Sequence, residues 1–172
     1  MFLQQQMTAE EFIALAEQHP DKRFDFIDGE IVEVSPKPLH GMIQVNFAAA
    51  LHAYNKRNPV GVVYTEVLHV LHDVKFIPDI SINHATLDDY LTDPPLIAIE
   101  IRSDTQSRAS QRRKAQDYIQ HGTPLVVLVL PGEGFEVFRP GKEAAVLSLD
   151  DVFDGGDELP GFKAVVRDML MF

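Results

Sequence analysis

The sequence contains no cysteine, so it has no disulfide framework, no thiolate zinc site and no cysteine nucleophile. It also lacks a long hydrophobic run, because the longest uncharged apolar stretch, residues 124–131, is far shorter than the roughly 20 residues that a membrane-spanning helix needs. Positive charge is scarce, with 15 lysines and arginines against 26 aspartates and glutamates and a formal net charge of −11. These shortages argue against a membrane protein and a basic nucleic-acid coat protein, and they leave oxygen and nitrogen groups for any catalysis.

The length and the N-terminus set the expected organisation. With 172 residues, 45% of them hydrophobic, the chain can bury one sizeable core, so we expect a single domain over residues 1–172. The first residues, Met1-Phe2-Leu3-Gln4-Gln5-Gln6, have neither the basic start nor the long apolar stretch of a signal peptide. We therefore expect a cytoplasmic protein.

Capping boxes, turn residues and apolar spacing divide the chain into helices and strands. Helices are expected at residues 8–20, 40–54 and 103–121. Strands are expected at residues 24–27, 30–34, 62–71, 74–82, 96–101, 125–130, 135–138 and 144–149, and a last segment near residues 164–170. The strands at 96–101 and 125–130 are almost wholly apolar, which is typical of strands covered on both faces, and the right-handed crossover rule makes them parallel neighbours. The pattern predicts an α/β or α+β sheet with helices on both faces.

Two carboxylates stand where a strand should be apolar. Glu100 lies inside the run at residues 96–101, and burying an unpaired charge costs several kcal/mol. Asp79 follows Pro78, which removes a hydrogen-bond donor from its strand. Two carboxylates brought together repel each other, and a divalent cation removes the repulsion, with hard oxygen ligands favouring Mg²⁺ or Mn²⁺ over Zn²⁺. The spacing alone favours the simpler alternative, in which each acid marks a strand end and faces water.

Positive charge is concentrated just after Glu100. Residues 102–114 carry a local charge of +4, while the rest of the chain carries −15. The cations in this segment are Arg102, Arg108, Arg112, Arg113 and Lys114. On a helical wheel Lys114 lies about 100° from Ala115, beside the buried stripe, so that its amine can reach the strand ends. A metal, a lysine and a cationic helix suit phosphodiester cleavage, whereas a solvated helix face is the alternative for the arginines.

A set of short motifs follows one order along nearly the whole chain. They are residues 8–12, Phe26-Ile27-Asp28-Gly29-Glu30-Ile31, His40, Pro78-Asp79, Ile99-Glu100-Ile101-Arg102-Ser103, and Lys114 with Tyr118 and Gly122. This ordered set resembles the Uma-two family, which is assigned to restriction endonucleases within the PD-(D/E)XK nuclease superfamily. The resemblance implies a restriction-endonuclease-like three-layer α-β-α core with a mixed sheet. It further implies Asp79 and Glu100 as metal ligands, Glu30 as an additional acid, and Lys114 as a lysine moved from the strand to the helix.

The chain departs from the superfamily pattern at one catalytic position. Arg102 stands where the usual lysine would fall, and an arginine stays protonated where a lysine must orient or deprotonate water. Lys114 must therefore supply the amine. The segment after Gly122 also lacks the acid and the tryptophan that relatives carry there. His40 opens a helix, where it either approaches the site as an accessory residue or caps the helix at the surface.

The sequence thus predicts a metal-dependent endonuclease that hydrolyses DNA phosphodiester bonds with Mg²⁺ or Mn²⁺. The expected catalytic residues are Glu30, Asp79, Glu100 and Lys114, and the expected DNA contacts are Arg102, Arg108, Arg112 and Arg113. We also expect a homodimer, because apolar residues occur in the terminal segment 164–172 and because the family resemblance implies two related sites that cut two strands. A catalytically inactive nucleic-acid-binding or assembly module is the main alternative, favoured by the missing strand lysine and the net charge of −11. A carbohydrate-binding or small-acid-binding protein is the third.

Overall fold

The computed structural model describes residues 8–19, 23–27, 30–34, 37–72, 74–104 and 106–171. Four helices lie in these ranges: α1 Ala9–Gln18, α2 Pro38–Asn55, α3 Arg108–Gln120 and α4 Val166–Leu170. Six strands form one sheet: β3 Val62–Thr65, β6 Ile80–Asn83, β7 Ile97–Ile101, β8 Val126–Leu130, β9 Gly134–Phe138 and β10 Ala145–Ser148. The others form pairs: β1 Arg23–Ile27 with β2 Glu30–Val34, β4 His69–Leu71 with β5 Val74–Phe76, and β11 Val152–Asp154 with β12 Lys163–Val165.

The central sheet is mixed. Its strand order is β10-β9-β8-β7-β6-β3, in which β7 and β8 are parallel and every other neighbouring pair is antiparallel. All residues of β7 and β8 are buried, as their apolar sequences predict. The predicted parallel neighbours, joined through one helix, are therefore confirmed.

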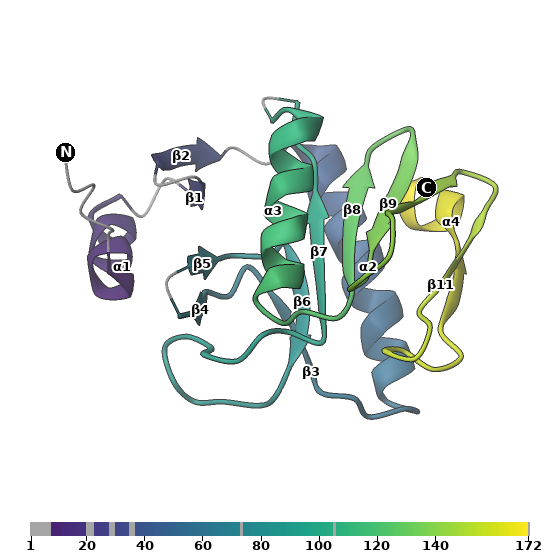
Figure 1. Ribbon diagram of the computed structural model, residues 1–172, viewed down its shortest axis with the longest axis horizontal. Helices are drawn as coiled ribbons and strands as arrows, with labels where there is room; N and C mark the ends of the chain where they lie inside the picture. The colour runs from purple at the N-terminus through teal and green to yellow at the C-terminus, as the bar shows by residue number, and fades with distance from the viewer. Residues whose placement is uncertain are drawn as a thin grey trace.

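Helices cover both faces of this sheet (Figure 1). The apolar stripe of α2, which includes Ile43 and Phe47, packs with Ile80 and Ile99 on one face. On the other face, Ala115 and Tyr118 of α3 share a second cluster with residues such as Ala98 and Leu128 of the sheet. Alternate residues of each central strand thus enter opposite cores, which is why β7 must be apolar on both sides.

The N-terminal elements form a smaller unit beside β4 and β5 (Figure 1). Helix α1 begins with the predicted capping box, in which Thr8 and Glu11 exchange two hydrogen bonds of 2.7 and 3.1 Å. Phe12 of α1 lies in a third hydrophobic cluster with Leu68. The predicted hairpin of β1 and β2 is confirmed, although its turn at residues 28–29 lies outside the described residues.

Three predictions from the sequence are wrong in detail. The strand expected at residues 62–71 is two strands, β3 and β4, because Glu66 takes a φ of 57°, which an extended strand cannot contain. The helix expected from Ser103 begins at Arg108, with Ser107 as its N-cap. The apolar residues near the C-terminus, expected to form a dimer contact, enter the protein's own core through Val166, Met169 and Leu170. The homodimer therefore stays a prediction without this support.

His69, in β4, gives the fold a predicted sensitivity to acid. Its side chain is completely buried, Nδ1 lies 2.9 Å from the carbonyl oxygen of Val67, and Nε2 has no hydrogen-bond partner among the described residues. Burial lowers the pKa of His69 from its ordinary 6.5, and nearby His84 lowers it further. Below pH 6.5 the unfolded chain therefore binds a proton that the folded chain does not.

We expect the free energy of unfolding to fall as the pH drops below 6.5, by at most about 1.4 kcal/mol per pH unit from this group, and to level off once the folded histidine protonates. Urea titrations between pH 8 and pH 5 measure this slope. His69→Leu should flatten it, while the matched change at the exposed His52 should not. Equal slopes in the native protein and His69→Leu would contradict the assignment.

Candidate active site

Glu100 lies in a buried polar triad between β7 and α3. Its Oε2 accepts a hydrogen bond of 2.9 Å from Nζ of Lys114, and its Oε1 accepts one of 2.7 Å from the hydroxyl of Tyr118. The side chains of Glu100 and Lys114 are 7% and 6% exposed. Lys114 and Tyr118 are four residues apart on the helix and so share the face that meets the sheet. The lysine on the helix therefore reaches the acid on the strand, as the wheel geometry suggests.

Asp79 lies just before β6 and binds the end of β7. Its Oδ2 accepts a 2.6 Å hydrogen bond from the amide of Ile101, and its Oδ1 lies 3.2 Å from Nε2 of His40. His40 is buried in the first turn of α2, so the alternative of a surface cap is wrong. Gln44, one turn later, donates to the carbonyl oxygen of Asp79. Helix α2 thus holds this acid from one side.

The register of the sheet brings the two acids to the same edge. Ile80 pairs with Ile99 across the antiparallel strands β6 and β7. Asp79 and Glu100 come next beyond this pair, and the hydrogen bond from the amide of Ile101 holds the Asp79 side chain beside the residue that follows Glu100. The Asp79 side chain meets α2 through His40, whereas the Glu100 side chain meets α3 through Lys114 and Tyr118. Both acids therefore lie at the carboxyl end of β7, where α3 begins its crossover.

Removal of Glu100 would do more than relieve the repulsion between two carboxylates. Glu100 is already neutralised by the Lys114 ammonium at 2.9 Å, so truncating Glu100 would leave a buried cation. We therefore expect truncation of Glu100 alone to destabilise the protein.

Three of the remaining predicted cations, Arg102, Arg108 and Arg112, have acidic partners. Arg102 donates from Nη2 to Glu133 at 3.1 Å, and Arg108 and Arg112 both donate to the completely buried carboxylate of Glu136 on β9, at 2.5 and 2.6 Å from their Nε atoms. Arg113 is exposed on α3. The side chain of Glu30, at the start of β2, lies outside the described part of the structure, so its role stays a prediction.

Glu136 is held ionised by its partners. Burial alone would raise the pKa of Glu136, but the hydrogen bonds from Arg112 and Arg108 outweigh burial and lower it below 4.5. The same pair raises the pKa of Arg112. Glu136 therefore remains a carboxylate, and the two guanidinium groups remain fixed over it, through the neutral pH range.

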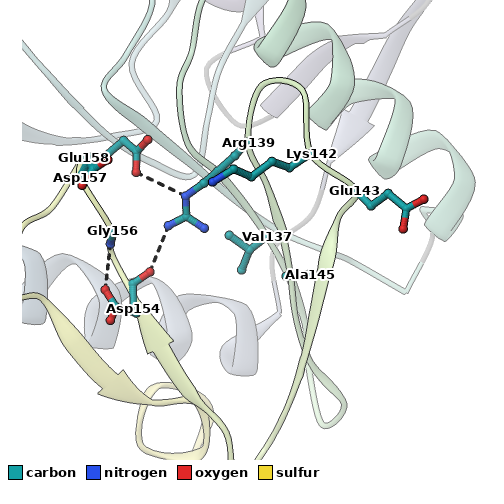
Figure 2. A pocket seen from close by; sticks show the side chains of 9 residues that line it. All are labelled: Val137, Arg139, Lys142, Glu143, Ala145, Asp154, Gly156, Asp157 and Glu158. Carbon is teal, nitrogen blue, oxygen red and sulfur yellow. Dashed lines mark hydrogen bonds and ion pairs between the residues drawn. The ribbon is translucent and has the colours of Figure 1, made fainter.

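A separate hollow of about 310 Å³ lies at the other end of the sheet, beyond the carboxyl end of β9 (Figure 2). Arg139 crosses it, donating to Glu158 at 3.3 Å and to the carbonyl oxygen of Asp154 at 3.1 Å. Gly156 takes a φ of 66°, and a Cβ there would lie only 3.0 Å from the Arg139 guanidinium. Because β9 runs antiparallel to β8, this hollow is remote from Asp79 and Glu100.

Comparison with protein families identifies the family of this chain. The model of the Uma2 family, described as "Putative restriction endonuclease", matches residues 9–167. The chain belongs to the Uma2 family. The resemblance to the Uma-two family is thus confirmed, and the match spans β6, β7 and α3 of this Uma2 protein. Among curated proteins none matches the chain.

A solved structure resembles this Uma2 protein in fold. It comes from Anabaena variabilis ATCC 29413 and is described as "a putative nuclease belonging to DUF820". The two superpose with a TM-score of 0.82 at 22% sequence identity, over 94% of this chain and 96% of that chain. At this identity the likeness shows a shared fold, namely the mixed sheet with helices on both faces.

The Uma2 protein has a donor set that fits a hard divalent cation. Asp79 and Glu100 supply carboxylate oxygens near one sheet edge, and each of these oxygens takes part in one of the contacts described above. Within the described ranges no cluster of three or more histidine, aspartate or glutamate side chains is suited to a metal. Two protein carboxylates suit Mg²⁺, which keeps several waters and binds substrate phosphate oxygens.

No helix in the described ranges is long and apolar enough to cross a membrane.

Two candidate functional residues, Glu136 and Tyr118, were not identified as such from the sequence. Glu136 stands between Phe135 and Val137 in an apolar strand, which is the same signal that singled out Glu100. Tyr118 was named from the sequence only as part of a motif with Lys114 and Gly122, yet its hydroxyl binds Glu100. The sequence does not reveal that the hydroxyl of a tyrosine among apolar helix positions meets a carboxylate on the adjacent sheet.

Proposed function

We propose that this Uma2 protein is a metal-dependent endonuclease that hydrolyses phosphodiester bonds of DNA. The observation that supports the proposal is the buried Glu100 carboxylate bound by Lys114, next in the chain to Ile101, whose amide binds Asp79. Buried ion pairs stabilise a fold poorly compared with apolar residues, so such a pair at a strand end favours a functional role.

Asp79 and Glu100 would hold Mg²⁺ or Mn²⁺, with Glu30 as an additional acid. The bound metal would supply an activated water and stabilise charge on the phosphate. His40 and the amide of Ile101 orient Asp79, because they contact its two oxygens. Asp79 is thereby fixed before a metal arrives, which lowers the cost of ordering it.

Lys114 would orient the attacking water and offset the negative charge of the phosphate. Its ammonium is fixed by the Glu100 contact and is nearly inaccessible to bulk water, so its charge acts in a poorly screened environment. The arginines at 102, 108, 112 and 113 would contact DNA phosphates, which positions the duplex without reading its sequence.

Metal titration tests this proposal directly. We expect calorimetry to detect Mn²⁺ or Mg²⁺ binding to the native protein and to lose it in Asp79→Asn, where a neutral amide still accepts from Ile101 but no longer attracts the cation. Supercoiled plasmid should be nicked by the native protein with these metals, and nicking should disappear in the same variant. Asp154→Asn, at the far end of the sheet, is the matched control and should keep both properties.

Unchanged metal binding in Asp79→Asn would refute Asp79 as a ligand. Absence of nicking with both metals would instead favour a catalytically inactive nucleic-acid-binding module. One observation favours that second candidate: both oxygens of Glu100 already accept hydrogen bonds, so a metal must compete with Lys114 and Tyr118.

A further inference from the structure

Three arginines and two glutamates meet at the carboxyl end of β7 and β8. Arg102 directly follows β7, and its amide continues the pairing with β8 through a hydrogen bond of 3.0 Å to the carbonyl oxygen of Val129. Arg108 and Arg112 come from the first turns of α3. We call Arg102, Arg108 and Arg112 the arginine cluster. Its two acidic partners, Glu133 and Glu136, differ sharply in exposure.

Glu136 forms the floor of the arginine cluster. Its carboxylate is completely buried and accepts from Nε of Arg108 and from both Nε and Nη2 of Arg112, at 2.5, 2.6 and 2.9 Å. In the sheet register Glu136 pairs with Leu128, which in turn pairs with Glu100, so the three occupy one row on the face covered by α3. A ligand cannot replace Glu136 without opening the core.

Glu133 is the exposed acidic partner of the arginine cluster. It lies in the turn between β8 and β9, and its side chain is 51% exposed. Its Oε1 lies 3.1 Å from Nη2 of Arg102 and its Oε2 lies 3.5 Å from Nη1 of Arg108, so one carboxylate bridges two guanidinium groups. Exposed ion pairs of this kind contribute little to stability.

The arginine cluster keeps unused donors. Nε of Arg102 is buried without a hydrogen-bond partner among the described residues. The Arg108 and Arg112 side chains are 40% and 47% exposed despite their contacts with Glu136. Three guanidinium groups against two carboxylates leave one positive charge, and displacing Glu133 would leave two. An anion richer in oxygens than a carboxylate is therefore the ligand that this arrangement favours.

We propose that the arginine cluster binds one phosphate group of a nucleic-acid strand beside the bond to be cut, and that Glu133 occupies the place of that phosphate in the free protein. The inference rests on the proposed function, because Arg102 is only two residues from Glu100 at the same sheet edge. Glu136 is a positioning residue: it fixes two guanidinium groups, and a phosphate displaces Glu133 but not Glu136.

The two glutamates should then have opposite effects on DNA binding. We expect Glu133→Gln to raise affinity for a fluorescein-labelled duplex about three- to tenfold and to steepen the salt dependence by about one unit of slope, because one more cationic contact reaches a phosphate. Glu136→Gln should lower affinity, since the guanidinium groups lose their fixed geometry. Anisotropy titrations in EDTA at several KCl concentrations measure both without metal-dependent cutting.

Two controls separate site geometry from general charge. Glu158→Gln removes an equal charge from another arginine pair, Arg139 with Glu158, at the opposite end of the sheet, and should leave affinity unchanged. Adding Arg102→Gln to Glu133→Gln should cancel the gain. Circular dichroism must show the native fold for Glu136→Gln; if this variant unfolds, the exposed Glu133→Gln and the Arg102 combination decide alone.

Equal affinity of Glu133→Gln and the native protein, or an equal gain in Glu158→Gln, would overturn the proposal. So would the absence of duplex binding by the native protein. Plasmid nicking is measured separately. If the native protein nicks plasmid but Glu133→Gln does not change DNA affinity, the phosphate site is rejected and the proposed nuclease function stands. If Glu133→Gln raises DNA affinity but the native protein does not nick plasmid, the phosphate site stands and the proposed nuclease function is rejected.

Discussion

Lys114→Met is expected to lower the rate of metal-dependent plasmid cleavage about 10²- to 10⁴-fold, which is the usual contribution of a group that positions or moves a proton. The side chain of Lys114 is buried beside Glu100, whereas Arg102, at the usual lysine position, is paired with Glu133. Metal affinity should persist or increase, because a positive charge next to the ligand is removed. Nicking rates with Mn²⁺ and calorimetry on the same preparation measure the two effects.

Lys163→Met provides the matched control, since this lysine is exposed and pairs with Asp154 far from the site. It should cleave like the native protein. Full cleavage activity in Lys114→Met would refute the assignment of the amine. If Lys114→Met loses both metal binding and cleavage, Lys114 keeps the metal ligands in place and need not take part in the cleavage step.

The second large effect concerns stability without metal. Lys114→Met should reduce the free energy of unfolding by about 3–5 kcal/mol, because it removes the ammonium that neutralises a buried carboxylate. The double variant Glu100→Leu/Lys114→Met should recover most of this loss or exceed the native stability, since apolar replacement of a buried ion pair is often neutral or stabilising by about 1–4 kcal/mol. Urea titrations of the native protein, of Glu100→Leu, of Lys114→Met and of the double variant give the four free energies of unfolding of a double-mutant cycle.

Recovery in an inactive double variant would show that the chain keeps the Glu100–Lys114 pair at a cost in stability. Such costs are typical of catalytic sites. If the double variant is instead as unstable as Lys114→Met, the pair has a structural role, and its burial is no evidence for catalysis.

The elements that position the site were predictable because they depend on local patterns. The apolar run around Glu100 identified β7, and the glycine at 122 marked the end of α3, where φ is 100°. The anomaly of a carboxylate in an apolar strand then located Glu100 itself. Its lysine partner followed from the position of Lys114 on the helical wheel.

The partners of the other charges were not predictable. The contact of Asp79 with the amide of Ile101, and the turn that brings Glu133 to Arg102, depend on strand pairing between segments far apart in the sequence, which periodicity does not encode. Glu66 could not be recognised as a strand break either, because a positive φ at a glutamate leaves no signature in the sequence. The arginines of α3 consequently looked like a free cationic face.

The division of the site between strands and one helix restricts where the chain can change length. Tyr118 and Lys114 meet Glu100 while Arg108 and Arg112 meet Glu136, so two rows of contacts depend on the same helical phase. A single inserted or deleted residue between positions 112 and 114 would turn one group by about 100° relative to the other and separate one of the two acids from its partners. Length variation among relatives that keep this site should therefore fall in residues 103–107 and 121–125, outside the helix.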